Sequence, residues 1–152
     1  MTRQTPDGMV KPEDMLCFDV YTLQQALSRV YKPLLEPLNL TYPQYLVMSV
    51  LWDAAPLPVG RIGARLGLET STVTPLLKRL EQQGLVERRR STEDERRVDV
   101  DLTKAGTDLA AKAADVPQCV ESATGLSQEG IARLRGDLQS VRENLLQSVR
   151  PD

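Results

Sequence analysis

The sequence predicts a mainly helical fold that contains one small β-hairpin, and three observations indicate it. Apolar residues recur at helical spacing in two long segments, 16–34 and 131–149, one near each end of the chain. Shorter helical patterns lie between them, and those at 59–66 and 69–83 are each followed by a glycine. Two strand-like runs, 85–90 and 97–102, flank a polar connection and indicate a hairpin. This order of elements is typical of a winged helix-turn-helix with long N- and C-terminal helices.

Composition excludes many kinds of chemistry. The 152 residues are 41% hydrophobic and 26% charged, which is typical of a globular protein. Histidine is absent from the sequence, so Ser-His-Asp and Cys-His catalysis are excluded, and we expect neither a metal nor a cofactor. No apolar run approaches the ~20 residues of a membrane span and no signal-peptide pattern begins the sequence, so we expect a cytoplasmic protein without a membrane partner. Cys17 and Cys119 are then expected to be reduced thiols.

The first helix is predicted to begin near residue 16 and to end around the prolines at 33 and 37. Its apolar residues are spaced alternately four and three apart, which gives a heptad-like seam. They are Leu16, Val20, Leu23, Leu27, Val30 and Leu34. Residues 1–12 are polar and show no periodicity. We therefore expect a mobile arm over 1–12 and a single domain over 13–152.

A buried central helix and a short second helix are predicted next. Thr41 followed by Gln44 forms a capping-box pattern with a proline in the first turn. Residues 45–52 are apolar on nearly all sides of a helix, which indicates burial. After a predicted break at 54–58, a short helix should cover 59–66 and end at the following glycine.

The following helix, over 69–83, has two different faces. Thr70 or Ser71 is expected as its N-cap, and Gly84 follows its end. One face is apolar and consists of Val73, Leu77 and Leu80. The other face is small, polar or basic and consists of Ser71, Thr74, Pro75, Lys78, Arg79 and Gln82. Such a face is typical of a DNA recognition helix, although an ordinary amphipathic surface helix would show the same pattern.

The strands predicted at 85–90 and 97–102 complete a winged helix-turn-helix over 57–103. In this arrangement the hairpin, or wing, can reach the minor groove or the DNA backbone beside the recognition helix. The net charge is −2, yet residues 61–90 carry seven basic and three acidic side chains. A solvated charged helix would also account for such a run, but a basic block within an acidic protein favours a nucleic-acid partner.

Two helices are predicted beyond the wing. The first begins at a threonine cap and covers about 103–114, and the second covers 127–149 after a break at 115–119. The terminal segments 13–38 and 104–150 present more apolar helix surface than a domain of this size can cover. We therefore expect a homodimer held by these segments about a two-fold axis.

Five segments between residues 14 and 150 carry more specific motifs. They are Leu16-Cys-Phe18, Tyr31-Lys-Pro-Leu-Leu35, Leu40-Thr-Tyr-Pro-Gln-Tyr-Leu46, Thr74-Pro-Leu-Leu-Lys-Arg-Leu-Glu81, and Glu93-Asp-Glu-Arg96 followed by Leu102-Thr-x-x-Gly106. With these motifs the chain resembles the MarR family of bacterial winged-helix regulators. Within that family it is similar to the two-cysteine organic hydroperoxide resistance regulators (OhrR type). The Asp-x-Arg wing is a feature of the wider family, whereas the Cys17 context and the Tyr-Pro-Gln-Tyr motif indicate a peroxide sensor.

This resemblance implies a transcriptional repressor, not an enzyme, that binds operator DNA as a dimer and is released when organic hydroperoxides oxidise Cys17. The implied peroxide pocket consists of Phe18, Tyr21, Tyr31 and Tyr42. The implied resolving thiol is Cys119, which we expect in a mobile break and bonded to Cys17 of the other subunit. Tyr31 follows Cys17 by 14 residues, about 21 Å along one helix. We therefore expect Cys17 to meet Tyr31 only across two antiparallel copies of the helix.

On DNA, we expect a pseudo-palindromic duplex with half-sites about one helical turn apart. Base contacts are expected from Ser71, Thr72 and Thr74, and phosphate contacts from Lys78, Arg79, Arg88, Arg89 and Arg90. Pro75 and Arg97 are placed in the same interface, and Asp94 is expected to position Arg96. Two alternatives stay open, namely a MarR-type regulator that senses a small aromatic ligand without redox chemistry, and a thiol peroxidase enzyme.

Overall fold

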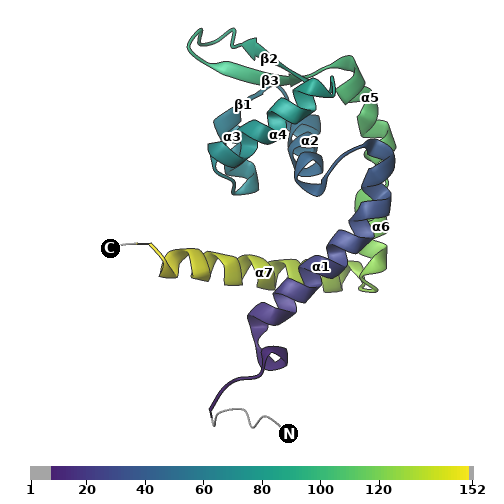
Figure 1. Cartoon of the computed structure of the whole chain (residues 1–152), viewed down its shortest axis with the longest axis vertical. Coiled ribbons are helices and arrows are strands. Elements are labelled where there is room, and N and C mark those ends of the chain that lie inside the picture. The colour runs from purple at the N-terminus through teal and green to yellow at the C-terminus, as the bar shows by residue number, and fades with distance from the viewer. Residues whose placement is uncertain (1–7, 151–152) are drawn as a thin grey trace, which may run out of the picture. The chain divides into compact units, whose positions relative to one another are not determined.

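The computed structural model describes residues 8–150 and divides into two compact units, Met1–Ala114 and Asp115–Asp152, which are treated separately below (Figure 1). Most of the predicted arm, residues 1–7, lies outside the described part of the chain. The first described element is a 3-10 turn, η1, at Pro12–Asp14. Across residues 8–150, no helix is both long enough and apolar enough to cross a membrane.

The first unit contains the predicted helices and hairpin in the predicted order. The long first helix ends two residues beyond Pro33, in agreement with the sequence pattern. The elements after η1 are α1 (Leu16–Leu35), η2 (Glu36–Leu38), α2 (Tyr42–Ala54), β1 (Leu57–Pro58), α3 (Val59–Leu66), α4 (Thr70–Gln82), β2 (Val86–Arg90), β3 (Val98–Leu102) and α5 (Lys104–Ala113).

Local capping explains where α2 begins but not where α4 begins. The Thr41 hydroxyl accepts from the backbone N–H of Gln44, and the Gln44 side chain accepts from the Thr41 N–H at 2.9 Å, so the predicted capping box is confirmed. The prediction for α4 is wrong by one residue. Its N-cap is Glu69, which is extended and makes no side-chain cap bond, while Thr70 already has helical geometry.

The sheet has three antiparallel strands in the order β1-β3-β2. β2 and β3 form the predicted hairpin, with Val86 opposite Leu102 and Arg90 opposite Val98. β1 was not predicted and lies within the segment interpreted as a break. It consists of two residues, one of them Pro58, so it has too few residues for an alternating pattern and forms only by pairing with β3.

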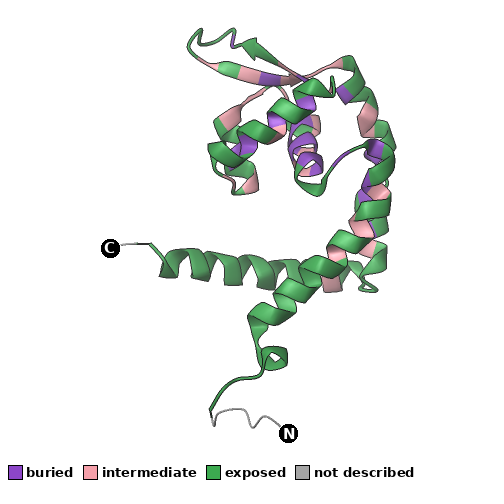
Figure 2. Ribbon diagram, in the orientation of Figure 1, coloured by how far each residue is buried: buried purple, intermediate pink, exposed green. Residues whose placement is uncertain are grey.

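The core of the first unit lies between α2, α3, α4 and the inner face of β3 (Figure 2). Its fully buried side chains include Val47, Met48, Leu51, Ile62, Val73, Leu77, Leu80 and Val100. All three residues predicted for the apolar face of α4 belong to this group. Burial of that face fixes which side of α4 is turned to solvent.

The second unit contains α6 (Val116–Ala123) and α7 (Gln128–Ser148). The predicted break at 115–119 is wrong, because residues 116–119 form the first turn of α6. Pro117 occupies that turn, where the missing N–H costs no helical hydrogen bond. The predicted long helix is confirmed as α7, and the hydroxyl of its N-cap Ser127 accepts from the Gly130 N–H at 3.1 Å. Cys119 is therefore an exposed residue of a helix and not part of a loop.

Candidate nucleic-acid interface and sensor thiol

The helix-turn-helix is formed by α3 and α4. The turn between them is tight, because a Cβ at Gly63 would lie 2.6 Å from the carbonyl oxygen of Leu68. With its apolar face buried, α4 exposes the residues assigned to DNA, which are Ser71, Thr72, Thr74, Pro75, Lys78 and Arg79. Among the described residues, neither Lys78 nor Arg79 has an ion-pair partner. The outer face of α4 therefore presents hydroxyl groups and two available cations.

The arginines of the wing are not equivalent, which the sequence did not indicate. Arg88 pairs with Glu81 of α4 at 3.6 Å. Arg89 pairs with Glu87 and with Asp101, the latter at 3.7 Å. Arg97 pairs with Asp99 at 3.0 Å. Within residues 8–150, Arg90 and Arg96 have no carboxylate within ion-pair distance, so they are the wing arginines available to a ligand.

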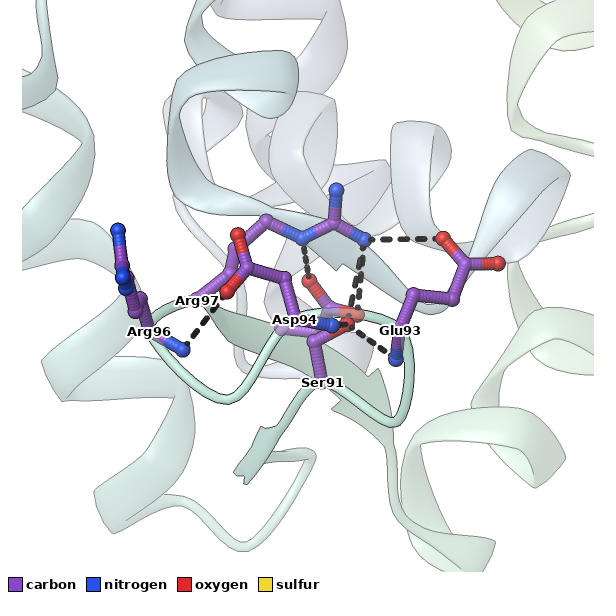
Figure 3. A network of polar contacts seen from close by, with 6 residues as sticks. Ser91, Glu93, Asp94, Arg96 and Arg97 are labelled. Carbon is purple, nitrogen blue, oxygen red and sulfur yellow. Dashed lines mark hydrogen bonds and ion pairs between the residues drawn. The ribbon is translucent and has the colours of Figure 1, made fainter.

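The turn of the wing is organised around the buried Ser91 (Figure 3). The Ser91 hydroxyl accepts from the backbone N–H groups of Glu93 and Asp94 at 3.2 and 3.4 Å, and from Arg97 Nη2 at 3.4 Å. Asp94 Oδ1 accepts from the backbone N–H of Arg96 at 3.0 Å. Asp94 thus holds the backbone of Arg96, and the Arg96 guanidinium lies apart from the network in Figure 3.

The candidate sensor thiol lies at the beginning of α1. Cys17 is the second residue of the helix and is exposed, as are Phe18 and, one turn further on, Tyr21. Because α1 is continuous to Leu35, Tyr31 lies about 21 Å from Cys17 along the axis. Within one chain, Cys17 is therefore followed directly by Phe18 and, one turn later, by Tyr21, but it is far from Tyr31.

Tyr31 and Tyr42 do meet, with ring centroids 4.6 Å apart. Tyr45 joins them, its ring centroid 6.1 Å from that of Tyr31. The sequence reasoning missed Tyr45, although its i, i+3 spacing from Tyr42 on α2 would place both rings on one side of the helix. Beside this cluster is a hollow of about 330 Å3, whose lining includes Ser28, Tyr31 and Tyr42.

Partial burial of Tyr31 keeps its phenol protonated to a higher pH than usual. Desolvation first, and the nearby Tyr42 and Tyr45 second, raise the pKa of Tyr31 from 10.0 to about 12. Burial also raises the pKa of Tyr45. The Tyr31 hydroxyl is protonated at neutral pH, as in any tyrosine, and the raised pKa extends that state to more alkaline pH.

We expect the free energy of unfolding to decrease as the pH rises from about 10 to about 12. In the unfolded chain Tyr31 ionises near its ordinary pKa of 10.0, whereas the folded chain keeps the proton to about 12. The unfolded state then binds fewer protons than the folded state in this window. The contribution of Tyr31 to the free energy of unfolding is therefore fully present below pH 10 and is lost as the pH rises towards 12. Urea unfolding at several alkaline pH values should show a shallower decrease for Tyr31→Phe, and equal slopes would contradict the assignment.

The comparisons with known proteins decide the family. The MarR family model matches residues 40–98, from two residues before α2 to the first residue of β3. The organic hydroperoxide resistance transcriptional regulator of Bacillus subtilis is 44% identical over 138 residues, which covers 91% of this chain and 94% of that protein. The chain belongs to the MarR family. It is therefore a DNA-binding winged-helix transcription regulator and not an enzyme.

Other proteins that are similar to this chain are also transcription regulators or have been solved on DNA. The regulator TtmR of Methylorubrum extorquens is 44% identical over 145 residues, which cover 95% of this chain and 74% of that protein. Reduced AbfR bound to DNA has a TM-score of 0.72 at 31% identity, with 86% of this chain and 91% of that chain covered. AbfR, from Staphylococcus epidermidis, has also been solved with a disulfide, with a TM-score of 0.61 and 30% identity over 88% and 89% of the two chains.

Proposed function

We propose that this MarR protein is a peroxide-sensing repressor that binds operator DNA as a dimer and leaves it when an organic hydroperoxide oxidises Cys17. The observation that carries the proposal is the placement of an exposed thiol in the first turn of α1, beside Phe18 and Tyr21. The similarity to an organic hydroperoxide regulator supports the same function. Phe18 gives the thiol an apolar neighbour, which favours alkyl hydroperoxides over hydrogen peroxide.

The proposed sensor pocket is complete only in the dimer. Many apolar residues of α1 and α7 are exposed in the single chain, with Leu134, Leu138 and Val141 of α7 all about two-fifths exposed. Pairing these helices across a two-fold axis would cover them. Antiparallel pairing of two α1 helices would also bring Cys17 of one protomer to Tyr31 and Tyr42 of its partner. The protonated Tyr31 would then donate a hydrogen bond to the thiolate and stabilise it.

We expect the reduced protein to have the mass of two chains at micromolar concentration, measured by light scattering. Replacing Leu138 by glutamate should shift it towards the monomer, because a carboxylate would have to be buried in the interface. Glu143→Gln on the same helix is the control. A wild-type monomer would contradict both the dimer and the pocket shared between protomers.

The redox step has two stages. The Cys17 thiolate attacks the terminal oxygen of ROOH, so that an S–O bond forms, the O–O bond breaks, and the alkoxide takes up a proton and leaves as ROH. The resulting sulfenic acid then reacts with the Cys119 thiol of the partner chain, which forms the S–S bond and releases water. Cys119 is exposed on α6, so it is available to this reaction. Drawing the two sulfurs to bonding distance would move α1 or α6 and with them the DNA-binding helices.

A mobility shift tests the function. The probe is a duplex selected from a random pool by the reduced protein, and the oxidant is cumene hydroperoxide. We expect the complex to dissociate on oxidation and to form again with dithiothreitol. Mass spectrometry measures how much of Cys17 has been oxidised. A protein–DNA complex that persists after Cys17 is oxidised would contradict the proposal.

The second candidate is a regulator that senses a small aromatic ligand. The hollow beside Tyr31 and Tyr42, of about 330 Å3, is within the range of small-molecule sites and favours this reading. Release from DNA would then persist in a chain that lacks Cys17.

A further inference from the structure

We infer that the wing assigns its arginines to two roles. Arg89 and Arg97 are retained by carboxylates of the wing itself, whereas Arg90 and Arg96 contact DNA. The inference rests on DNA binding by the reduced protein and not on the redox response. It changes the expectation from the sequence, in which Arg88, Arg89 and Arg90 were equivalent phosphate ligands.

Arg89 relieves a repulsion that the strand register creates. On the hairpin, Glu87 of β2 lies directly opposite Asp101 of β3. Two like charges in directly opposed positions destabilise an antiparallel pair. The Arg89 guanidinium contacts both, through Nη2 to Glu87 and through Nη1 to Asp101 Oδ2 at 3.7 Å. Moving Arg89 to a phosphate would leave this carboxylate pair without its cation.

Arg97 closes the turn of the wing. Its Nε donates to Asp99 Oδ1 at 3.0 Å and its Nη2 to Oδ2 at 3.5 Å, which is a forked pair. The same Nη2 donates to the Ser91 hydroxyl and lies 3.7 Å from Glu93 (Figure 3). The Asp99 side chain is only 13% exposed, so little solvent would be available to replace its partner if Arg97 turned to DNA.

Arg90 and Arg96 can contact a phosphate without breaking an ion pair of the wing. Arg90 ends β2 and Arg96 lies in the turn, and both are exposed. Their guanidinium groups have no ion pair among the described residues, so a phosphate would displace only water and counterions. The backbone of Arg96 is already held by Asp94. The carboxylates of the wing thus reduce the number of its arginines that any duplex can engage.

The salt dependence of binding counts the phosphate contacts and so tests the inference. Affinity of the reduced protein for a random-sequence duplex is measured by fluorescence anisotropy between about 50 and 200 mM salt. We expect Arg90→Gln and Arg96→Gln each to reduce the magnitude of the negative slope of log K against log salt by about 1.8 for the dimer, which is about 0.9 for each of the two protomers. Arg89→Gln and Arg97→Gln should leave the slope unchanged, even where a loosened turn weakens binding.

Freeing a retained arginine gives the opposite change. Asp101→Asn should allow Arg89 of each protomer to reach a phosphate and increase the magnitude of the slope by up to about 1.8 for the dimer. Glu95→Gln is the matched control, because it removes the same charge from an exposed position of the wing that has no ion pair among the described residues. Thermal unfolding followed by circular dichroism verifies that each variant is folded. If Arg97→Gln is unfolded, the slopes of Arg89→Gln and Asp101→Asn test the inference without it.

Two results would overturn the inference. One is a slope for Arg89→Gln that decreases as much as that for Arg96→Gln, and the other is equal behaviour of Asp101→Asn and Glu95→Gln. Failure of the wild type to bind any duplex would instead contradict DNA binding itself. Loss of the peroxide response alone would leave the assignment of the arginines intact, because every measurement uses the reduced protein.

Discussion

Replacement of Cys17 by serine is expected to leave DNA binding intact and to abolish its loss on treatment with cumene hydroperoxide. A serine hydroxyl is not oxidised under these conditions, so no sulfenic acid can form. The side chain is exposed at the start of α1 and contributes nothing to the core, so the fold should be unaffected. The mobility shift should show an oxidant-dependent change of at least tenfold in wild-type affinity and none in the variant.

Cys119→Ser separates the two stages of the switch. Its Cys17 can still form a sulfenic acid, which a dimedone probe would detect, but no disulfide can follow. Non-reducing electrophoresis after oxidation should therefore show a covalent dimer in the wild type and none in either variant. Release of Cys17→Ser from DNA by peroxide would contradict the redox function and favour the ligand-sensing alternative.

Gly106→Ala is expected to have the largest effect on stability. Gly106 lies in the first turn of α5, and a Cβ there would overlap the carbonyl oxygen of Leu85. That oxygen cannot retreat freely, because it accepts a hydrogen bond from the Thr103 N–H at 3.1 Å. The Gly106 carbonyl in turn accepts from Trp52 Nε1 at 2.8 Å, which ties α5 to α2. Forcing these segments apart should cost about 3 kcal/mol of the free energy of unfolding.

Gly60→Ala is the matched control for this substitution. Gly60 is also helical and lies in the same unit, but a Cβ there would meet no atom within 4 Å. Alanine should therefore be neutral or stabilise the protein by up to about 1 kcal/mol, through its higher helix propensity. Urea unfolding followed by the fluorescence of Trp52 measures both variants. Equal stability of the two would show that the contact at Leu85 is not tight.

The elements that the sequence predicted well are those with local signals. The capping box at Thr41 and Gln44 involves groups three residues apart, so it is complete in the sequence itself. The break predicted around Cys119 was wrong because a proline is compatible both with a break and with the first turn of a helix. β1 was missed because a two-residue strand has no periodicity of its own and depends on pairing with β3.

By itself the sequence determined the order of the winged helix, the two faces of α4 and the position of Cys17 at a helix start, because helical periodicity and capping depend on neighbours along the chain. Only the tertiary structure decided that Tyr45 joins Tyr31 and Tyr42, and which arginines of the wing are paired. Those results depend on the packing of α1 against α2 and on the register that sets Glu87 opposite Asp101. A run of three arginines is uniform in sequence, but its members differ in the fold. Arg88 meets Glu81 of α4, Arg89 on the other face of the strand meets Glu87 and Asp101, and Arg90 meets no carboxylate among the described residues.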